Sequence, residues 1–300
     1  MIFESKKLSK TVEIIQQFIL KDCLPIPLNT VCMVSAKGGV GKTNLSLFIA
    51  SKYINSYDGN VGLWLTEDEE GNIRHRVNKL IEHNIINEFN EDRAELIINN
   101  PVHLVKSQGK EFVADMETID ALKLFCIERD IRLLVIDPLL AFYGGNENDN
   151  SQARTFMQPF INWCKEVDIT IILIHHSSKG DGVNTRGAGA FVDAVRCAYT
   201  ISMPLKQEGN SIMEDQDKIA DGFRVITCTK DNRGVIPLIY KNYNSNPFEM
   251  RLIPPINILH LPKNIIDFDS IVRNAKAKIT VEVDEYIYSS DENSFIGSLL

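Results

Sequence analysis

Apolar runs of strand length alternate with stretches of helical periodicity along the first two thirds of the chain. The apolar runs cover 30–36, 60–66, 131–137 and 169–175. The last two lack polar alternation, which is typical of parallel strands covered on both faces. Helical stretches separate the runs at 43–57, 72–86, 117–130 and 151–167. This alternation predicts an α/β fold with a mostly parallel, twisted sheet flanked by helices.

The pattern differs at the two ends of the chain. Apolar residues at helical spacing predict an amphipathic N-terminal helix over 5–21; they are Leu8, Val12, Ile15, Phe18 and Ile19. After Tyr199, short runs separated by "KDNRG" and "NSNP" predict antiparallel strands that extend the sheet. The pattern weakens from Asn257. We therefore expect an N-terminal helical segment (1–22), a main domain (23–256) and a C-terminal docking or assembly tail (257–300).

Composition narrows the class of protein. With 44% hydrophobic residues, the 300-residue chain has enough apolar side chains for a sizeable core. A net charge of -8 argues against a surface coated for nucleic acid, although a few local basic loops remain possible contacts. The six cysteines form no C-x-x-C pair, which favours buried, reduced thiols. The N-terminus lacks a signal-peptide core and no apolar run is long enough to span a bilayer, so we expect a cytoplasmic protein without membrane contact.

The stretch "SAKGGVGKTN" follows a predicted strand and opens a predicted helix. Such a turn places backbone N–H groups and a helix N-terminus around a phosphate chain. We assign nucleotide binding to Gly38, Gly39, Val40, Gly41, Lys42, Thr43 and Asn44. Lys42 would neutralise the β- and γ-phosphates of ATP, and Thr43 would offer its hydroxyl to Mg²⁺. Ala36 stands where the first glycine of such loops belongs, and Lys37 is an extra lysine of open role.

Acidic residues at strand ends complete the predicted phosphate chemistry. Asp137 ends the apolar run "LLVID" and is the predicted partner of Thr43 in holding Mg²⁺. Glu67 follows the run at 60–66, and we expect it to act as the general base on the attacking water. Asp68 is the neighbouring alternative.

Histidines and basic residues follow the last apolar run. Adjacent residues of a strand point to opposite faces, so one of His175 and His176 is expected to pack and the other to contact the γ-phosphate or water. Lys179 and Arg186, in a glycine-rich polar segment, are candidate contacts for nucleic-acid phosphates. Further cations lie at a predicted helix end and at a predicted hairpin tip; they are Arg196, Lys230 and Arg233.

Taken together, these blocks resemble the RepA-like hexameric helicase ATPases, a branch of the RecA/DnaB-type motors. The resemblance rests on "AKGGVGKT", "LTED…RHR", "LLVIDPLLAFYGGNENDNS", "HHSSKG", "RGAGAFVDAVR" and "TKDNRG", in that order. It implies a RecA-like core in 23–256, with Glu67 as catalytic base and His176 as sensor. It further implies that Arg196 is an arginine finger and that Lys230 lies on a basic hairpin that reaches a neighbour's nucleotide.

The resemblance also implies a hexameric ring that binds ATP and Mg²⁺ between subunits and acts as a replicative helicase or translocase on single-stranded DNA. Other replication proteins are expected partners. Segments 144–151 and 177–185 would face the channel, with Tyr143 as the main aromatic candidate for stacking on a base. The first of these segments is acidic and rich in amides, which departs from a basic DNA-gripping loop.

Three alternatives remain open at this point. A ParA/MinD-type partition ATPase also carries "KGGVGKT", and there Lys37 would cross to the partner's phosphate in a dimer. Against it, Thr66 replaces the first acidic residue expected after the second strand. A recombinase or KaiC-like regulatory ATPase is the second alternative, and a module that binds nucleotide without hydrolysing it is the third.

Overall fold

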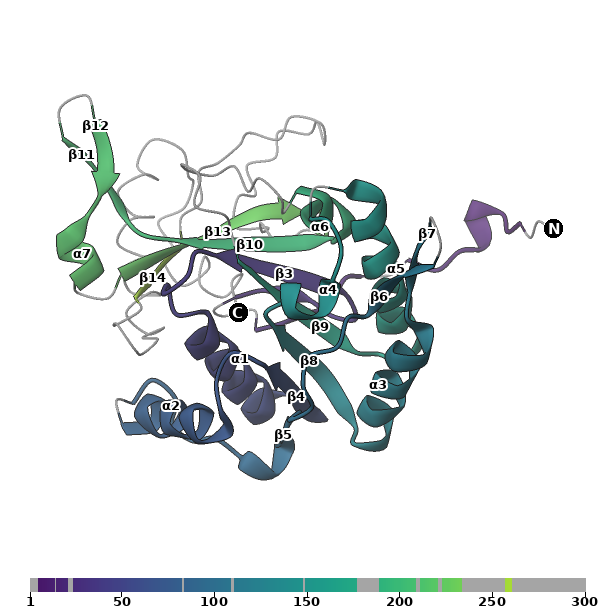
Figure 1. The fold of residues 1–300 in the computed structure, drawn as a ribbon, viewed down its shortest axis with the longest axis horizontal. Coiled ribbons are helices and arrows are strands. Elements are labelled where there is room, and N and C mark those ends of the chain that lie inside the picture. The colour runs from purple at the N-terminus through teal and green to yellow at the C-terminus, as the bar shows by residue number, and fades with distance from the viewer. Residues whose placement is uncertain are drawn as a thin grey trace.

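The computed structural model (Figure 1) has one central sheet with helices on both faces. It describes residues 5–13, 15–20, 24–82, 84–108, 111–147, 149–176, 189–208, 211–220, 223–233 and 257–260. The predicted strands within 235–243 and 249–255, Cys23 and the tail after 260 lie outside the described residues, as do Lys179 and Arg186.

Among the described residues the central sheet has eight strands and is mostly parallel, which confirms the predicted fold class. In spatial order the strands are β5 (Ala94–Leu96), β4 (Asn60–Leu65), β8 (Ile131–Asp137), β9 (Thr170–His176), β3 (Val31–Ala36), β10 (Cys197–Ser202), β13 (Phe223–Asp231) and β14 (Asn257–His260). Neighbours from β5 to β10 run parallel, whereas β13 is antiparallel to β10 and β14 to β13. The segment Asn257–His260, expected to belong to the tail, is a strand of this sheet and stands at its edge among the described residues.

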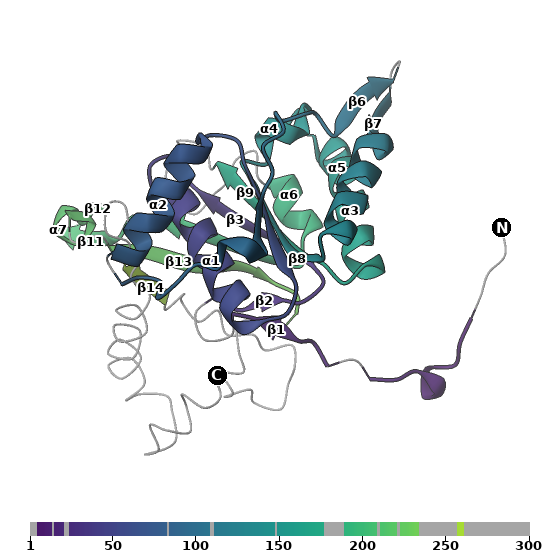
Figure 2. The same ribbon diagram turned by 90° about the horizontal axis from the view of Figure 1, so that it is seen from below.

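Alternating side chains of the parallel strands enter two separate cores. Cys32 and Val34 of β3 pack on one face with α1 (Lys42–Ser56) and α2 (Glu70–Glu82), and Val31 and Met33 pack on the other. The second face is covered by α3 (Met116–Glu128), α5 (Asn150–Glu166) and the short α6 (Gly189–Ala194). Figure 2 shows the two helical layers on either side of the sheet. This burial on both faces explains why the strands read as continuous apolar runs.

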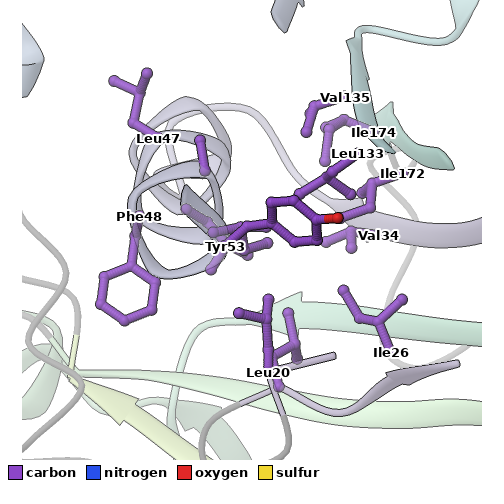
Figure 3. Packing of buried hydrophobic residues seen from close by; sticks show 14 of the residues in the cluster. Leu20, Ile26, Val34, Leu47, Phe48, Tyr53, Leu133, Val135, Ile172 and Ile174 are labelled. Carbon is purple, nitrogen blue, oxygen red and sulfur yellow. The ribbon is translucent and has the colours of Figure 1, made fainter. Parts of the chain in front are cut away.

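A small hairpin closes the first core. It consists of β1 (Phe18–Ile19) and β2 (Ile26–Pro27), and it brings Leu20 and Ile26 toward Tyr53 of α1. In Figure 3 the Tyr53 ring lies between the helix and the sheet side chains Leu133 and Ile172. The hairpin thus buries apolar surface of α1 that the sheet does not reach.

The remaining described elements lie outside the central sheet. They are η1 (Leu8–Lys10), η2 (Glu91–Arg93), the hairpin β6 (Val105–Gln108) and β7 (Glu111–Ala114), α4 (Leu140–Tyr143), the hairpin β11 (Leu205–Glu208) and β12 (Ser211–Glu214), and α7 (Gln216–Ala220). Among the described residues, none of the helices has both the length and the apolar character that crossing a bilayer requires.

The predicted N-terminal helix over 5–21 is wrong for the described residues. Only the single turn η1 is helical there, and Leu8, Val12 and Ile15 are 85%, 83% and 80% exposed. An amphipathic helix in water gains most of its stability from burying its apolar face, and the described part of the chain covers none of Leu8, Val12 and Ile15. Ile19 is instead buried by strand pairing in β1.

Gly59, in the turn between α1 and β4, supports a test of this fold. Its φ is +81°, and a Cβ there would lie 2.2 Å from Cγ of Arg132. We expect Gly59→Ala to lower the free energy of unfolding by about 2 kcal/mol or more, because a left-handed backbone costs an L-residue ~1–2 kcal/mol before any clash is counted. Urea denaturation measures the change. The matched control is Gly71→Ala in α2, where no atom lies within 4 Å of the added Cβ; an equal loss in both variants would contradict the prediction.

Candidate active site

The carboxyl ends of four neighbouring parallel strands form the edge of the sheet at which the predicted phosphate chemistry gathers. Strand β9, which ends in His176, lies between β3, which leads into the phosphate loop, and β8, which ends in Asp137. Register pairs Ala36 with His176, and Leu65 with Asp137. This order brings the ends of β4, β8, β9 and β3 together, as expected for ligand sites of open α/β sheets.

The loop after β3 has the backbone of a phosphate cradle. Gly39 and Gly41 have φ of +74° and +107°, and Gly41 is the N-cap of α1. A Cβ on either of them would meet no atom within 4 Å, so the loop is open toward a ligand and its glycines serve the backbone angles. Ala36 is the last residue of β3 and pairs with His176, so its extended backbone needs no glycine.

Lys42 is the first residue of α1, and its ammonium is turned into this edge. Its Nζ donates to the carbonyl of Lys37 at 3.2 Å and lies 3.2 Å from Nδ1 of His176. Burial lowers the pKa of Lys42, while the carboxylates of Asp137 and Glu67 raise it. The Lys37 residue is exposed and contacts Lys42 through its backbone oxygen.

Asp137 and Thr43 lie together beneath the loop. The Thr43 hydroxyl is 3.5 Å from Oδ2 of Asp137, whose side chain is 2% exposed. Burial raises the pKa of Asp137 to about 7; Lys42 counteracts this and Glu67 adds to it. Oδ1 of Asp137 has no hydrogen-bond partner among the described residues.

A buried carboxylate oxygen without a donor, beside a threonine hydroxyl, fits a hard cation with oxygen ligands such as Mg²⁺. Among the described residues, no three His, Cys, Asp or Glu side chains gather as a metal cluster. Thr43 and Asp137 would therefore hold the ion together with the nucleotide phosphates, as Mg²⁺ is usually bound.

His176 joins the loop lysine to the predicted base. Its Nε2 lies 2.9 Å from Oε1 of Glu67, while Nδ1 faces the Lys42 ammonium. Because an ammonium can only donate, Nδ1 accepts, and Nε2 therefore carries the hydrogen that is donated to Glu67. Three predicted residues from three separate elements thus form one hydrogen-bonded chain.

A family model described as AAA domain matches residues 18–182, which is more than half of the chain. The chain belongs to this family. It is a P-loop ATPase. No curated protein matches the chain. The matched region of the ATPase includes the loop, Glu67, Asp137 and His176, and it ends before Arg196 and Lys230.

Arg76 is a site residue that the sequence did not single out. From α2 it holds both carboxylate oxygens of Asp68, through Nε at 3.1 Å and Nη2 at 3.3 Å, and its Nη1 reaches Oδ1 of Asn44 at 3.4 Å. Asp68 is therefore an anchor of the segment that carries Glu67, rather than a second candidate base. The signal was the "RHR" block, but sequence does not distinguish Arg76 from Arg74, which faces out and pairs with Glu91.

His175 lies on the opposite face of β9 from His176, as expected for adjacent strand residues. Its ring is buried, 5.7 Å from the ring of Phe191, and burial lowers its pKa to about 4. Neither ring nitrogen has a hydrogen-bond partner among the described residues. The nearest carboxylate belongs to Glu147, 4.0 Å away. His175 is thus a buried neutral residue outside the hydrogen-bonded chain of Lys42, His176 and Glu67.

Arg196 and Lys230 lie away from the ATPase loop of their own chain. The pairing of Cys197 with Cys32 places Arg196 at the amino ends of the parallel strands, roughly 15 Å along β3 from the loop. Arg196 is exposed and follows α6, which ends at Ala194, two residues earlier than the predicted helix. Lys230 pairs with Ala198 at the same edge. The structure does not bring either cation to Lys42.

Tyr143 is not available to stack on a base, which corrects our expectation. Its side chain is 1% exposed and packs edge-on against Phe112, Phe156 and Phe191. Its hydroxyl donates to the carbonyl of Asn146 at 3.1 Å. The tyrosine therefore anchors the start of the 144–151 segment to the second core.

Arg76→Ala tests the role of the anchor on α2. We expect kcat for ATP hydrolysis to fall about 10-fold to 100-fold with little change in nucleotide KM, because a displacement of the Glu67 segment by about 1 Å is enough for such a loss. Steady-state kinetics measures both constants. Arg74→Ala removes an exposed ion pair from the same helix and is expected to leave kcat unchanged. Equal kinetics in the two variants would show that Arg76 does not position Glu67.

His175 predicts a specific pH dependence of stability. Its folded pKa of about 4 lies below the unfolded value of 6.5, so between these values the unfolded chain binds more protons. The stability that neutral His175 contributes is present above pH ~6.5 and is lost as pH falls toward ~4, by about 1.4 kcal/mol per unit of that window. We expect His175→Gln to lose less stability than the native protein between pH 7 and 4.5 in urea denaturation. The exposed His75→Gln is the control, and identical pH profiles for all three proteins would contradict the prediction.

Proposed function

We propose that this ATPase is a ring-forming motor on single-stranded DNA, a replicative helicase or translocase of the RepA-like type, acting in the cytoplasm. The observation that carries the proposal is the division of the site between two edges of the sheet. Lys42, His176 and Glu67 are joined at one edge, whereas the exposed Arg196 lies at the other. Because Arg196 is exposed and far from the phosphate loop of its own chain, it suits a nucleotide site that is completed by a neighbouring copy.

The cis residues then have separable roles. Backbone N–H groups of the loop and Lys42 bind the phosphates of ATP, and Glu67 accepts a proton from the attacking water. His176 orients Glu67 through its Nε2–H, and its contact with Lys42 lets it respond when the γ-phosphate leaves. Mg²⁺, when held by Thr43 and Asp137, neutralises charge on the phosphates. Arg196 of a neighbouring copy stabilises the charge of the transferring phosphoryl group, a contribution of about 10³–10⁵ in rate.

Two observations weigh on the alternatives. The "HHSSKG" block supplies His176 to the site, and Lys37 contacts Lys42 only through its backbone oxygen, which supports the motor over a ParA-type dimer. The burial of Tyr143 and the acidic segment after it favour a second candidate, a recombinase or KaiC-like regulatory ATPase with little grip on DNA.

The decisive measurement is the ATPase rate with and without single-stranded DNA. We expect a severalfold stimulation by single-stranded DNA and less by duplex DNA, because the channel of a translocating ring takes one strand. Light scattering with ATP and Mg²⁺ is expected to show a hexamer-sized particle. An ATPase that hydrolyses normally but ignores DNA would overturn the motor in favour of the regulatory enzyme, and a stable dimer would overturn the ring.

Mixing variants tests whether catalysis is shared between chains. Lys42→Ala and Arg196→Ala are each expected to lose most of the ATPase rate and to keep a slow residual rate, because each removes one half of every site. A mixture is expected to regain part of the activity, since some interfaces then pair an intact loop with an intact Arg196. Arg74→Ala, which removes an exposed arginine of α2, is the control with full activity. Loss of nucleotide binding in Arg196→Ala would mean that Arg196 is structural.

A further inference from the structure

Lys230 was expected to reach the nucleotide of a neighbouring copy, but in the structure it makes contacts within its own chain. Its Nζ donates to the backbone carbonyls of Val192 at 2.9 Å and Asp193 at 2.8 Å. Both carbonyls belong to the last turn of α6, which is only six residues long. Two of the three N–H donors of the ammonium are thus used on one helix end.

These contacts supply what a short helix lacks. The last carbonyls of a helix have no intrahelical donor, and they carry the negative end of its dipole. An ammonium placed there satisfies two of them and opposes that dipole. A helix of this length does not hold itself in water, so its end depends on such partners and on the burial of Phe191 and Val195.

The segment held in this way is the one that leads to Arg196. The backbone N–H of Asn232, two residues after Lys230, donates to the carbonyl of Arg196 at 2.9 Å. Residues at and just after the end of β13 therefore bind the backbone on both sides of Val195. Lys230 binds the carbonyls of Val192 and Asp193 before it, and Asn232 binds the carbonyl of Arg196 after it. In Figure 1, α6 lies beside the start of β10 and the end of β13.

The electrostatics agree with this geometry. Burial lowers the pKa of Lys230, the carboxylate of Asp193 raises it, and the guanidinium of Arg196 lowers it further. Arg196 is therefore close enough to affect Lys230, although its own side chain is exposed. To reach a nucleotide in a neighbouring copy, Lys230 would have to give up both carbonyls and release the segment that carries Arg196.

We propose that Lys230 is a positioning residue that locks the 192–196 segment, and that only Arg196 touches the neighbour's nucleotide. The inference rests on the proposed function for the role of Arg196, but the lock itself is a property of the single chain.

Amide hydrogen exchange tests the lock without reference to hydrolysis. In Lys230→Met, we expect severalfold faster exchange at the amides of Val195, bonded to the Phe191 carbonyl, and of Asn232, with α1 unchanged. Lys230→Arg keeps the donors and is expected to restore slow exchange. Lys206→Met, a surface lysine of β11, is the matched control. Unchanged exchange in Lys230→Met would overturn the inference.

A double-mutant cycle of the ATPase rate tests how Lys230 acts. If it acts only through Arg196, the pair Lys230→Met and Arg196→Ala is as slow as Arg196→Ala alone. A further loss in the double variant would overturn the inference, because Lys230 would then touch the nucleotide itself. Full activity in Arg196→Ala would instead overturn the shared site of the proposed function, while the exchange rates still decide the lock.

Discussion

The hydrogen bonds of His176 to Lys42 and Glu67 are the interaction on which the rest of the site depends. They link the lysine that follows β3 to the glutamate that follows β4. In the sheet β9 lies next to β3, whereas β8 stands between β9 and β4, so the histidine at the end of β9 spans three strand ends. Its two ring nitrogens suit one donor and one acceptor. Arg76 adds a second tie, from α2 through Asp68 to Asn44 of α1. The segment that carries Glu67 is thus tied to the start of α1 at two points, Lys42 and Asn44.

Several polar atoms at this edge are buried without partners in the described part of the chain. They include Oδ1 of Asp137, the hydroxyl of Ser35 and both ring nitrogens of His175. Each such group lowers the stability of the fold by about 1–3 kcal/mol, so its presence indicates a role other than stabilising the fold. For Asp137 the proposed function supplies such a role, which is to hold Mg²⁺ together with the nucleotide. We have no comparable physical account of Ser35.

The opposite edge of the sheet carries a different kind of order. There the end of β13 binds the backbone of α6 and of Arg196, while the Arg196 side chain stays exposed. In the ring proposed above, a fixed backbone would limit the entropy that is lost when the exposed guanidinium of Arg196 binds a phosphate of the neighbouring copy. The sheet connects this edge to the nucleotide edge, because β10 pairs directly with β3.

Sequence alone determined the parts of this ATPase whose chemistry is local. The parallel strands read as apolar runs because both faces are buried, and the phosphate loop is a contiguous strand–turn–helix whose glycines and Lys42 are recognisable without partners. Tertiary structure decided the rest. Three features depend on elements that only packing brings together. They are the choice of Arg76 over Arg74 as the partner of Asp68, the burial of Tyr143 and the contacts of Lys230. The prediction of an N-terminal helix is wrong for the same reason. Helical spacing gives a stable helix only where another surface covers the apolar face, and Leu8 and Val12 are exposed.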